Sequence, residues 1–235
     1  MLRDNRSQSP GMPVSRRGLL AAVGLGAGAA AIAGCATTPD TSGSEVTAAA
    51  TARSTPSTSP GAPLVMIVRH AEKPAAGTHG VTESGARDSA SLTVTGWTRA
   101  GGLVALFGAD GQPPREGLVT PDRIVASVGG GGASRRPLQT ITPLAARLGV
   151  EPVTRFTQDD LSGAAAFVRG QTGVTLISWE HHRIRGLIQE FGKVTPSPRD
   201  WPDDRFDMVW LLRPSETGWA LDEMAQLLLH GDRTV

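Results

Sequence analysis

The chain has no tyrosine, a single cysteine and no marked excess of charge of either sign. One cysteine excludes a disulfide bond within the chain. Of the 235 residues, 23 are basic and 22 acidic, so the formal net charge is +1. Residues 1–34 hold four of the basic residues and one of the acidic ones, which leaves 19 basic against 21 acidic in the rest. This balance gives no electrostatic case for nucleic acid as a partner.

A long apolar run is missing too. Residues 21–33 are apolar, but the run is short and rich in glycine and alanine, which argues against a membrane-spanning helix. Arg16 and Arg17 precede it, which resembles a twin-arginine export signal, and Ile-Ala-Gly-Cys closes it at Cys35, which resembles a bacterial lipobox. Residues 1–35 are therefore interpreted as a lipoprotein signal, which implies export and a lipid on Cys35 that anchors the protein at the extracytoplasmic face of the bacterial cell membrane. The alternative is a lone buried cysteine behind a chance basic pair.

Residues 36–63 consist largely of Thr, Ser, Ala, Pro and Gly and hold almost no large apolar side chain. Such a segment cannot bury enough surface to offset its ordering entropy, so we predict a flexible tether. Residues 64–235 then form one globular domain, in keeping with the usual size of single domains.

Short apolar runs alternate with amphipathic helical patterns along residues 64–235. Leu64 to Val68 is the first such run, and it ends abruptly in charged residues. Buried runs of this kind predict parallel strands, and their alternation with helices predicts an α/β fold, a three-layer αβα sandwich with a mostly parallel central sheet. We expect strands at 64–69, 123–128, 153–156 and 174–179, a hairpin at 208–221 with its turn at 213–215, and helices from Thr93 or Thr95 to 107, then at 137–148, 161–169 and 184–191.

Three pairs of polar residues follow these elements where parallel strands would place their carboxyl ends. Because such ends meet at one edge of a sheet, the pairs are expected to converge on one crevice. The planar fork of arginine matches phosphate oxygens, and a histidine nitrogen can attack phosphorus, so the pattern indicates phosphoryl chemistry. The alternative is a strand that simply ends in charged residues at the surface. The pairs are Arg69-His70, Arg135-Arg136 and His181-His182.

Four motifs in the same order resemble those of the histidine phosphatase superfamily, which has the phosphoglycerate mutase-like fold. The resemblance covers about residues 64–212, and four motifs on the expected elements are far more specific than one. The motifs are Arg69-His70-Ala71-Glu72, Leu92-Thr93-x-x-Gly96-Trp97-x-Arg99-Ala100, Ser134-x-Arg136-Pro137-x-Gln139-Thr140 and Trp179-x-His181-x-x-Ile184.

The resemblance implies a phosphomonoester hydrolase of the histidine acid phosphatase type that needs neither a metal nor another cofactor. His70 would be the nucleophile and carry the phosphoryl group as phosphohistidine. Arg69 and Arg136 would bind the phosphate oxygens, and His181 would contact the same phosphate and stabilise the transition state. The expected partner is a phosphorylated small molecule or a phosphoprotein as substrate, and its identity does not follow from the sequence.

Three site assignments stay open at this stage. The glycine-rich stretch at 129–133 lengthens the loop before the arginine pair, so Arg135 competes with Arg136. His182 competes with His181, which we favour. The family's proton donor is an acidic residue from another loop, although an aspartate ahead of a helix more often serves as its cap. The candidates for this role are Glu180, Asp159 and Asp160, with Glu72 as an outsider.

Two rival functions and several other residues were weighed. A phosphoglycerate mutase is disfavoured because no long insertion is visible and the export signal does not suit it. A non-catalytic lipoprotein that uses the same fold to bind a phosphate ligand is the main alternative. A zinc site at Glu180-His181-His182 is disfavoured because the spacing is not that of His-Glu-x-x-His. His79 and His230 are expected at the surface, and Trp201, Trp210 and Trp219 as packing for the terminal hairpin.

Overall fold

The computed structural model describes residues 62–129 and 134–235 of the chain. The predicted export signal, Cys35, all but the last two residues of the tether and residues 130–133 of the glycine-rich stretch lie outside these ranges, so what was predicted for them stays a prediction. Within the described ranges, no helix combines the length and the apolar character that crossing a bilayer requires.

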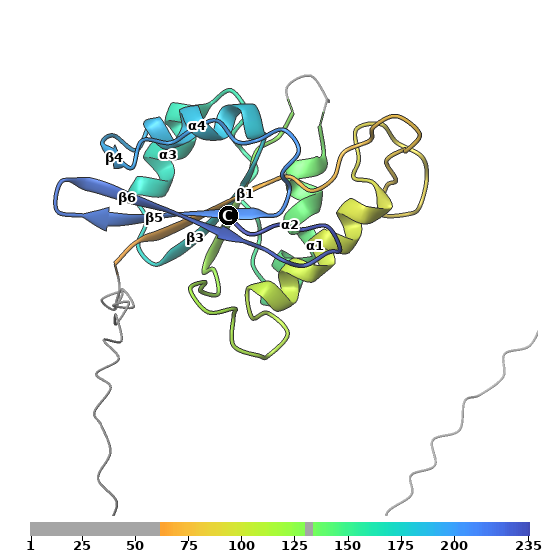
Figure 1. The fold of residues 1–235 in the computed structure, drawn as a ribbon, viewed down its shortest axis with the longest axis horizontal. Coiled ribbons are helices and arrows are strands. Elements are labelled where there is room, and N and C mark those ends of the chain that lie inside the picture. The colour runs from red at the N-terminus through yellow and green to blue at the C-terminus, as the bar shows by residue number, and fades with distance from the viewer. Residues whose placement is uncertain (1–61, 130–133) are drawn as a thin grey trace, which may run out of the picture. The chain divides into compact units, whose positions relative to one another are not determined.

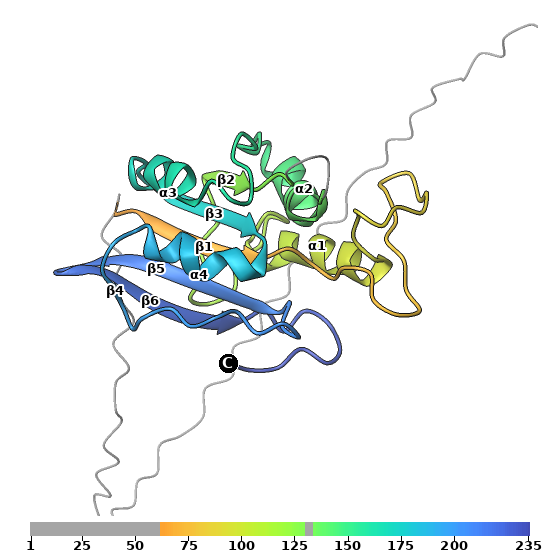
Figure 2. The ribbon, with the colours of Figure 1, turned by 90° about the horizontal axis from the view of Figure 1, so that it is seen from above.

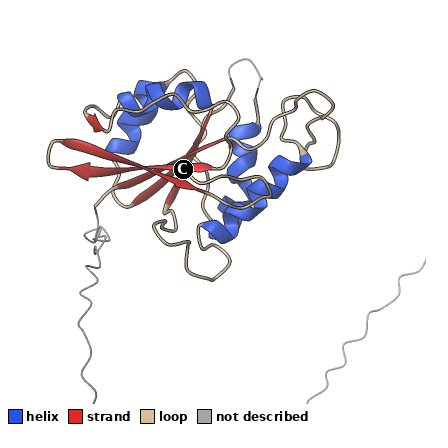
Figure 3. Cartoon of the chain, viewed as in Figure 1, coloured by secondary structure: helices blue, strands red, loops and turns tan. Residues whose placement is uncertain are grey.

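Six strands of the described chain form one sheet (Figures 1 and 3). They are β1 (Leu64–Arg69), β2 (Arg123–Ala126), β3 (Val174–Trp179), β4 (Val194–Thr195), β5 (Met208–Ser215) and β6 (Gly218–Ala225), in the order β2-β3-β1-β5-β6-β4. β5 runs antiparallel to both of its neighbours, and the other pairings are parallel. Five of these six strands therefore point the same way, which confirms the predicted α/β fold with a mostly parallel sheet.

Helices cover both faces of this sheet. They are α1 (Val94–Leu106), α2 (Arg136–Leu148), α3 (Leu161–Arg169) and α4 (His181–Gln189). Leu64, Met66 and Val68 of β1 share one core with α1 and α2, whereas Val65 and Ile67 share the other with α3 and α4. Successive side chains of a strand point to opposite faces, so a strand covered on both sides must be apolar throughout. This explains the unbroken apolar run and confirms the αβα sandwich.

Local signals in the sequence set the helix ends. The side chain of Thr93 accepts a hydrogen bond from the backbone N–H of Gly96 and caps α1, and that of Asp160 caps α3 by accepting from Gly163. Pro137 lies in the first turn of α2, where its missing N–H costs nothing. Gly149 ends α2 in the left-handed conformation with φ of 66°.

Several boundaries differ from the prediction, among them the end of β2 at Ala126 instead of 128 and the start of α4 at His181 instead of 184. Residues 153–156 form no strand, and Val153 makes only an isolated bridge to Val125. The hairpin turns after Ser215, not at 213–215, because β5 continues to Ser215. This last part of β5 extends beyond β1 and is paired with β6 alone, so Pro214 lies where a residue without an N–H is tolerated. The helix expected to reach 191 ends at Gln189, and Phe191 closes a tighter turn by donating to Ile188.

Candidate functional site

The carboxyl ends of the neighbouring parallel strands β1 and β3 lie side by side at the same end of the sheet (Figure 2). The pairing runs to Arg69 opposite Trp179, and the backbone N–H of His70 continues it by donating to the Trp179 carbonyl at 3.0 Å. α4 begins at this end with His181. The first turn of α2 is tied to it as well, because the backbone N–H of Ala71 donates to Thr140 Oγ1 at 2.8 Å. The predicted crevice residues thus meet from β1, α2 and α4.

His70 is buried, with only 2% of its surface exposed. Its Nδ1 lies 2.8 Å from the carbonyl oxygen of Ala71, which can only accept, so Nδ1 carries the hydrogen and Nε2 keeps its lone pair. Burial lowers the pKa of His70 to about 3; the bond to Ala71 opposes this shift, and the charges of Arg69, Arg136 and His181 add to it. The ring is therefore neutral near neutral pH, with one nitrogen available as a nucleophile.

Arg69 is held by a distant loop. Its NH1 group donates to the backbone carbonyls of Asp203 at 2.7 Å, Arg205 at 2.9 Å and Pro202 at 3.3 Å. The guanidinium carbon lies 3.8 Å from the centre of the Phe206 ring. Burial lowers the pKa of Arg69 to about 10, so the group stays cationic. Nε and NH2 are buried and have no hydrogen-bond partner in the described chain.

Arg136 is half-buried, and its NH1 donates to the carbonyl of Ser89 at 3.1 Å. Its Nε is buried without a partner among the described residues. Burial lowers the pKa of Arg136, and the charges of Asp88 and Glu180 partly offset this. Arg135 is exposed, and its backbone N–H donates to Ala90. Of the two arginines, Arg136 is the one that is half-buried and has a buried side-chain nitrogen without a partner among the described residues.

His181 is buried between two carboxylates. Its Nδ1 lies 2.7 Å from Glu180 Oε1, but the angle falls outside hydrogen-bond geometry, so this buried nitrogen has no hydrogen-bond partner in the described chain. Its Nε2 donates to Asp203 Oδ1 at 2.9 Å. His182 is largely exposed and donates from Nε2 to the same oxygen at 3.0 Å. The ring centres of His70 and His181 are 6.1 Å apart.

The other acidic candidates lie elsewhere. Asp160 caps α3, and Asp159 pairs with Arg183 at the surface at 2.7 Å. Glu72 pairs with the buried Arg99 at 2.8 Å, an ion pair that positions α1. Of the four carboxylates named from the sequence, only Glu180 contacts the histidines of the crevice.

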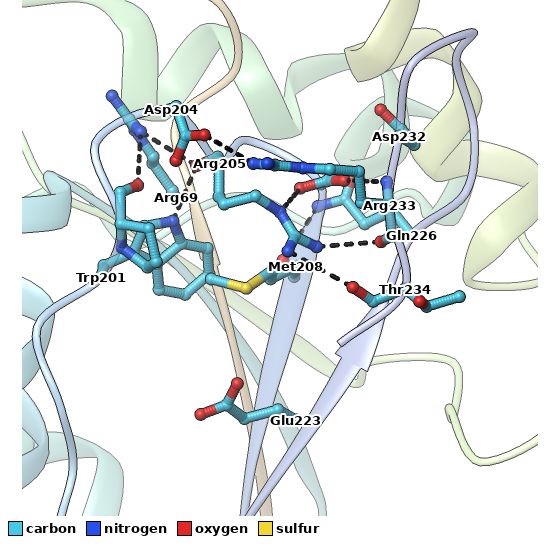
Figure 4. A network of polar contacts seen from close by, with 12 residues as sticks. Arg69, Trp201, Asp204, Arg205, Met208, Glu223, Gln226, Asp232, Arg233 and Thr234 are labelled. Carbon is cyan, nitrogen blue, oxygen red and sulfur yellow. Dashed lines mark hydrogen bonds and ion pairs between the residues drawn. The ribbon is translucent and has the colours of Figure 1, made fainter.

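The loop around Arg69 is in turn tied to the C-terminal segment (Figure 4). Arg205 donates from Nε to Asp207 at 2.5 Å and from NH2 to the carbonyl of Arg233 at 2.9 Å. Arg233 pairs with Asp204 at 2.7 Å. These bonds fix the carbonyl groups that receive the Arg69 side chain.

Sequence reasoning missed Asp203, Arg205 and Phe206. No spacing connects them to Arg69, which lies more than 130 positions earlier in the chain. The only sequence signal for these residues was the run of charged side chains at 203–205, just before the terminal hairpin. The predictions for the other histidines and for the tryptophans are confirmed: His79 and His230 are exposed, and Trp201 packs on Trp210 of the hairpin with ring centres 4.8 Å apart. Trp219 packs against Phe191.

No protein-family model matches the sequence, and no curated protein matches it. Among solved structures, the chain is similar to the protein histidine phosphatase SixA complexed with tungstate, with 15% identity and a TM-score of 0.46, covering 69% of this chain and 97% of that one. It is also similar to a mycobacterial glucosyl-3-phosphoglycerate phosphatase, with 13% identity and a TM-score of 0.44, covering 68% and 96%. A phosphoserine phosphatase variant from Entamoeba histolytica in complex with phosphoserine matches with 10% identity and a TM-score of 0.43, covering 72% and 99%. At these identities the matches carry no argument about activity, which has to come from the site itself.

Proposed function

We propose that the chain is a phosphomonoester hydrolase of the histidine phosphatase superfamily that works without a metal ion through phosphohistidine on His70. One observation carries the proposal. A neutral histidine whose Nε2 keeps its lone pair lies beside two arginines, each with a buried side-chain nitrogen that has no partner among the described residues. Leaving buried cationic donors unpaired is costly, and a phosphate group would satisfy them with charge-assisted hydrogen bonds.

The proposed reaction has two displacements at phosphorus. Nε2 of His70 attacks the phosphate monoester, the bond between phosphorus and the alcohol oxygen breaks, and that oxygen takes a proton from Glu180. Water then attacks the phosphohistidine, returns a proton to Glu180 and releases inorganic phosphate. Arg69, Arg136 and His181 donate to the non-bridging oxygens, over which the charge is spread in the transition state.

Glu180 must gain a proton before it can donate one. Burial alone would raise the pKa of its carboxyl group, but the contact with His181 and the charges of His181 and His182 outweigh burial, so the pKa is lowered. In the free site Glu180 is therefore ionised. A phosphate dianion bound beside it raises the pKa again, because a neighbouring like charge disfavours the carboxylate. Substrate binding would thus favour protonation of Glu180, and the protonated carboxyl group can then donate to the leaving oxygen.

A cavity beside the site suits the alcohol part of the substrate. It has a volume of about 420 Å³ and is lined by Lys73, Thr78 and Thr93. Asp203 and Phe206, which contact Arg69, line it as well. This volume is in the range of ordinary small-molecule pockets. It supports a small phosphate ester as substrate.

The test is an assay of the purified chain on a panel of phosphate esters in the presence of a metal chelator. Release of inorganic phosphate that depends on His70 and is insensitive to the chelator would support the proposal. Saturable binding of inorganic phosphate without turnover of any ester would favour the non-catalytic phosphate-binding protein instead.

Glu180→Gln is expected to lower kcat for an alkyl phosphate by about 10²-fold, the lower end of what general acid catalysis contributes. The loss should be smaller for an aryl phosphate, because a phenolate leaves without a proton. Asp160→Asn and Asp159→Asn are the matched controls, since Asp160 caps α3 and Asp159 pairs with Arg183, and both should retain kcat. An equal loss on alkyl and aryl esters in Glu180→Gln would contradict the proton-donor role.

We further propose that the protein is exported and anchored through lipidated Cys35. Cys35→Ala is expected to move the protein from the membrane fraction to the soluble fraction, because the substitution removes the acceptor of the lipid. Fractionation with immunoblotting measures the shift, and mass spectrometry of the mature N-terminus tests processing. A Cys35→Ala protein that is processed normally and stays with the membrane would refute the anchor.

A further inference from the structure

Asp203 contacts two of the proposed phosphate-binding residues at once. Its backbone carbonyl accepts from Arg69 NH1 at 2.7 Å, and its side-chain Oδ1 accepts from His181 Nε2 at 2.9 Å. It belongs neither to β1, which carries Arg69, nor to α4, which begins with His181. Its side chain is 82% exposed, so no packing requirement explains where the carboxylate lies.

The contact decides which nitrogen of His181 faces the phosphate site. Because Nε2 donates to Asp203, Nδ1 is the nitrogen left for a ligand, and it is buried without a hydrogen-bond partner in the described chain. One nitrogen of His70, one of His181 and one oxygen of Glu180 lie within 4.8 Å of one another. The two histidines and Glu180 are therefore close enough to act on one phosphoryl group, and Glu180 Oε1 lies 2.7 Å from Nδ1 of His181.

The doubled histidine has a place in this arrangement. His182 donates from Nε2 to the same Asp203 oxygen at 3.0 Å, and its ring lies 3.9 Å from that of His181. Both hydrogen bonds are made to one oxygen of the carboxylate, and they lower the pKa of Asp203. Asp203 is thus a fixed negative charge at neutral pH, on the far side of His181 from the phosphate.

We propose that Asp203 is a positioning residue for the phosphoryl transfer, which its side chain aids by orienting His181 and stabilising the positive charge on that ring. This inference rests on the proposed function and extends it to a residue outside the four motifs. A charged acceptor bonded to one imidazole nitrogen fixes the tautomer and the ring plane, so the other nitrogen is presented to the substrate. The groups that face His181 are then Asp203, Glu180, His182 and His70.

Asp203→Asn and Asp203→Ala separate this role from support of the loop. Both substitutions keep the backbone carbonyl that holds Arg69, so the inhibition constant for inorganic phosphate should change little. We expect kcat to fall about 10- to 100-fold in Asp203→Ala, the effect of losing one hydrogen bond to a charged group. The fall should be smaller in Asp203→Asn, whose amide oxygen can still accept from His181 but carries no charge. Asp200→Asn, three positions earlier and paired with Arg185 at the surface, is the matched control and should retain kcat.

A spectroscopic readout completes the test. In wild-type protein with ¹⁵N-labelled histidine, NMR should show a proton on His181 Nε2 in a strong hydrogen bond, and Asp203→Ala should lose that signal. Near-wild-type kcat in both Asp203 variants, or an equal loss in Asp200→Asn, would overturn the proposal. If wild-type protein turns over no ester, the proposed function fails, and the NMR signal still decides whether Asp203 orients His181.

Discussion

Arg136→Ala is expected to lower kcat/KM by about 10²- to 10³-fold, the usual cost of removing one preorganised donor from a developing negative charge. Arg135→Ala should stay within a few-fold of wild type. The two arginines have the same side chain and are adjacent in sequence, so the two substitutions remove the same charge and the same donors from neighbouring positions.

The geometry around the start of α2 is the reason for the difference. Thr140 Oγ1 donates to the carbonyl of Arg136 at 2.7 Å and accepts from the backbone N–H of Ala71 at 2.8 Å. This chain of hydrogen bonds fixes the first turn of α2 relative to the residue after His70. The half-buried Arg136 side chain is thereby aimed at the crevice, with a buried Nε that still lacks a partner in the described chain. Arg135 is the residue before the helix, and its side chain is exposed.

Arg136→Lys refines the comparison. Lysine keeps the charge but has no planar fork for two phosphate oxygens, so only part of the lost kcat/KM should return. Circular dichroism and thermal melts on each variant check that α2 is intact. If Arg135→Ala proves damaging while Arg136→Ala is mild, the register assigned through the glycine-rich stretch is wrong.

The parts of the fold that were predictable from sequence depend on local signals. The unbroken apolar run of β1 reports a strand buried on both faces, and Asp160 ahead of the α3 pattern reports a helix cap. Residues that follow parallel strands also meet at one edge by geometry alone. This is why Arg69, His70 and His181 could be grouped before any coordinates were known.

The contacts that were not predictable are long-range and involve backbone groups. Arg69 is received by three carbonyls, and a carbonyl group is present at every residue, so no side-chain pattern marks those that are used. Asp203 reaches His181 from 22 positions further along the chain, beyond both α4 and β4. The sequence could not identify the proton donor among Glu180, Asp159 and Asp160 either. A helix cap, a surface ion pair and a site residue all use the same carboxylate group and differ only in the residues around it.

His70→Ala is expected to abolish turnover, since no other group in the described crevice presents a nucleophilic nitrogen with the same support. The fold should persist, because the residue lies at the edge of the sheet and outside both apolar cores. His70→Asn is the second variant: its amide can still donate to the Ala71 carbonyl, as Nδ1 of His70 does at 2.8 Å, but offers no nucleophile. Loss of activity in both variants with unchanged melting curves would assign the defect to chemistry.

The intermediate can be trapped directly. Wild-type protein mixed with a ³²P-labelled ester and quenched in alkali should carry label on histidine, because phosphohistidine is acid-labile and survives base. Peptide mapping should place the label on His70. Turnover at the wild-type rate in His70→Ala, or label recovered on serine or aspartate, would exclude the mechanism.

The pH dependence follows from the low pKa of His70, about 3, which burial sets first of all. His70 becomes cationic, and loses its lone pair, only as the pH falls through that value. The profile of kcat/KM reports the free enzyme and should therefore show its His70 limb near pH 3. A limb near pH 6 would instead belong to the second ionisation of the phosphate ester, at about 6, and should move with the ester used.

The lowered pKa of His70 also makes the stability of the fold depend on pH, with a definite sign. The unfolded chain binds the His70 proton at higher pH than the folded one, so folding stability falls as the pH drops below about 6.5 towards about 3. His70→Asn removes that loss, so its free energy of unfolding should decline less steeply with acid than that of wild type. Parallel curves for the two proteins would show that His70 is not held neutral in the folded state, and the basis for its nucleophilicity would be gone.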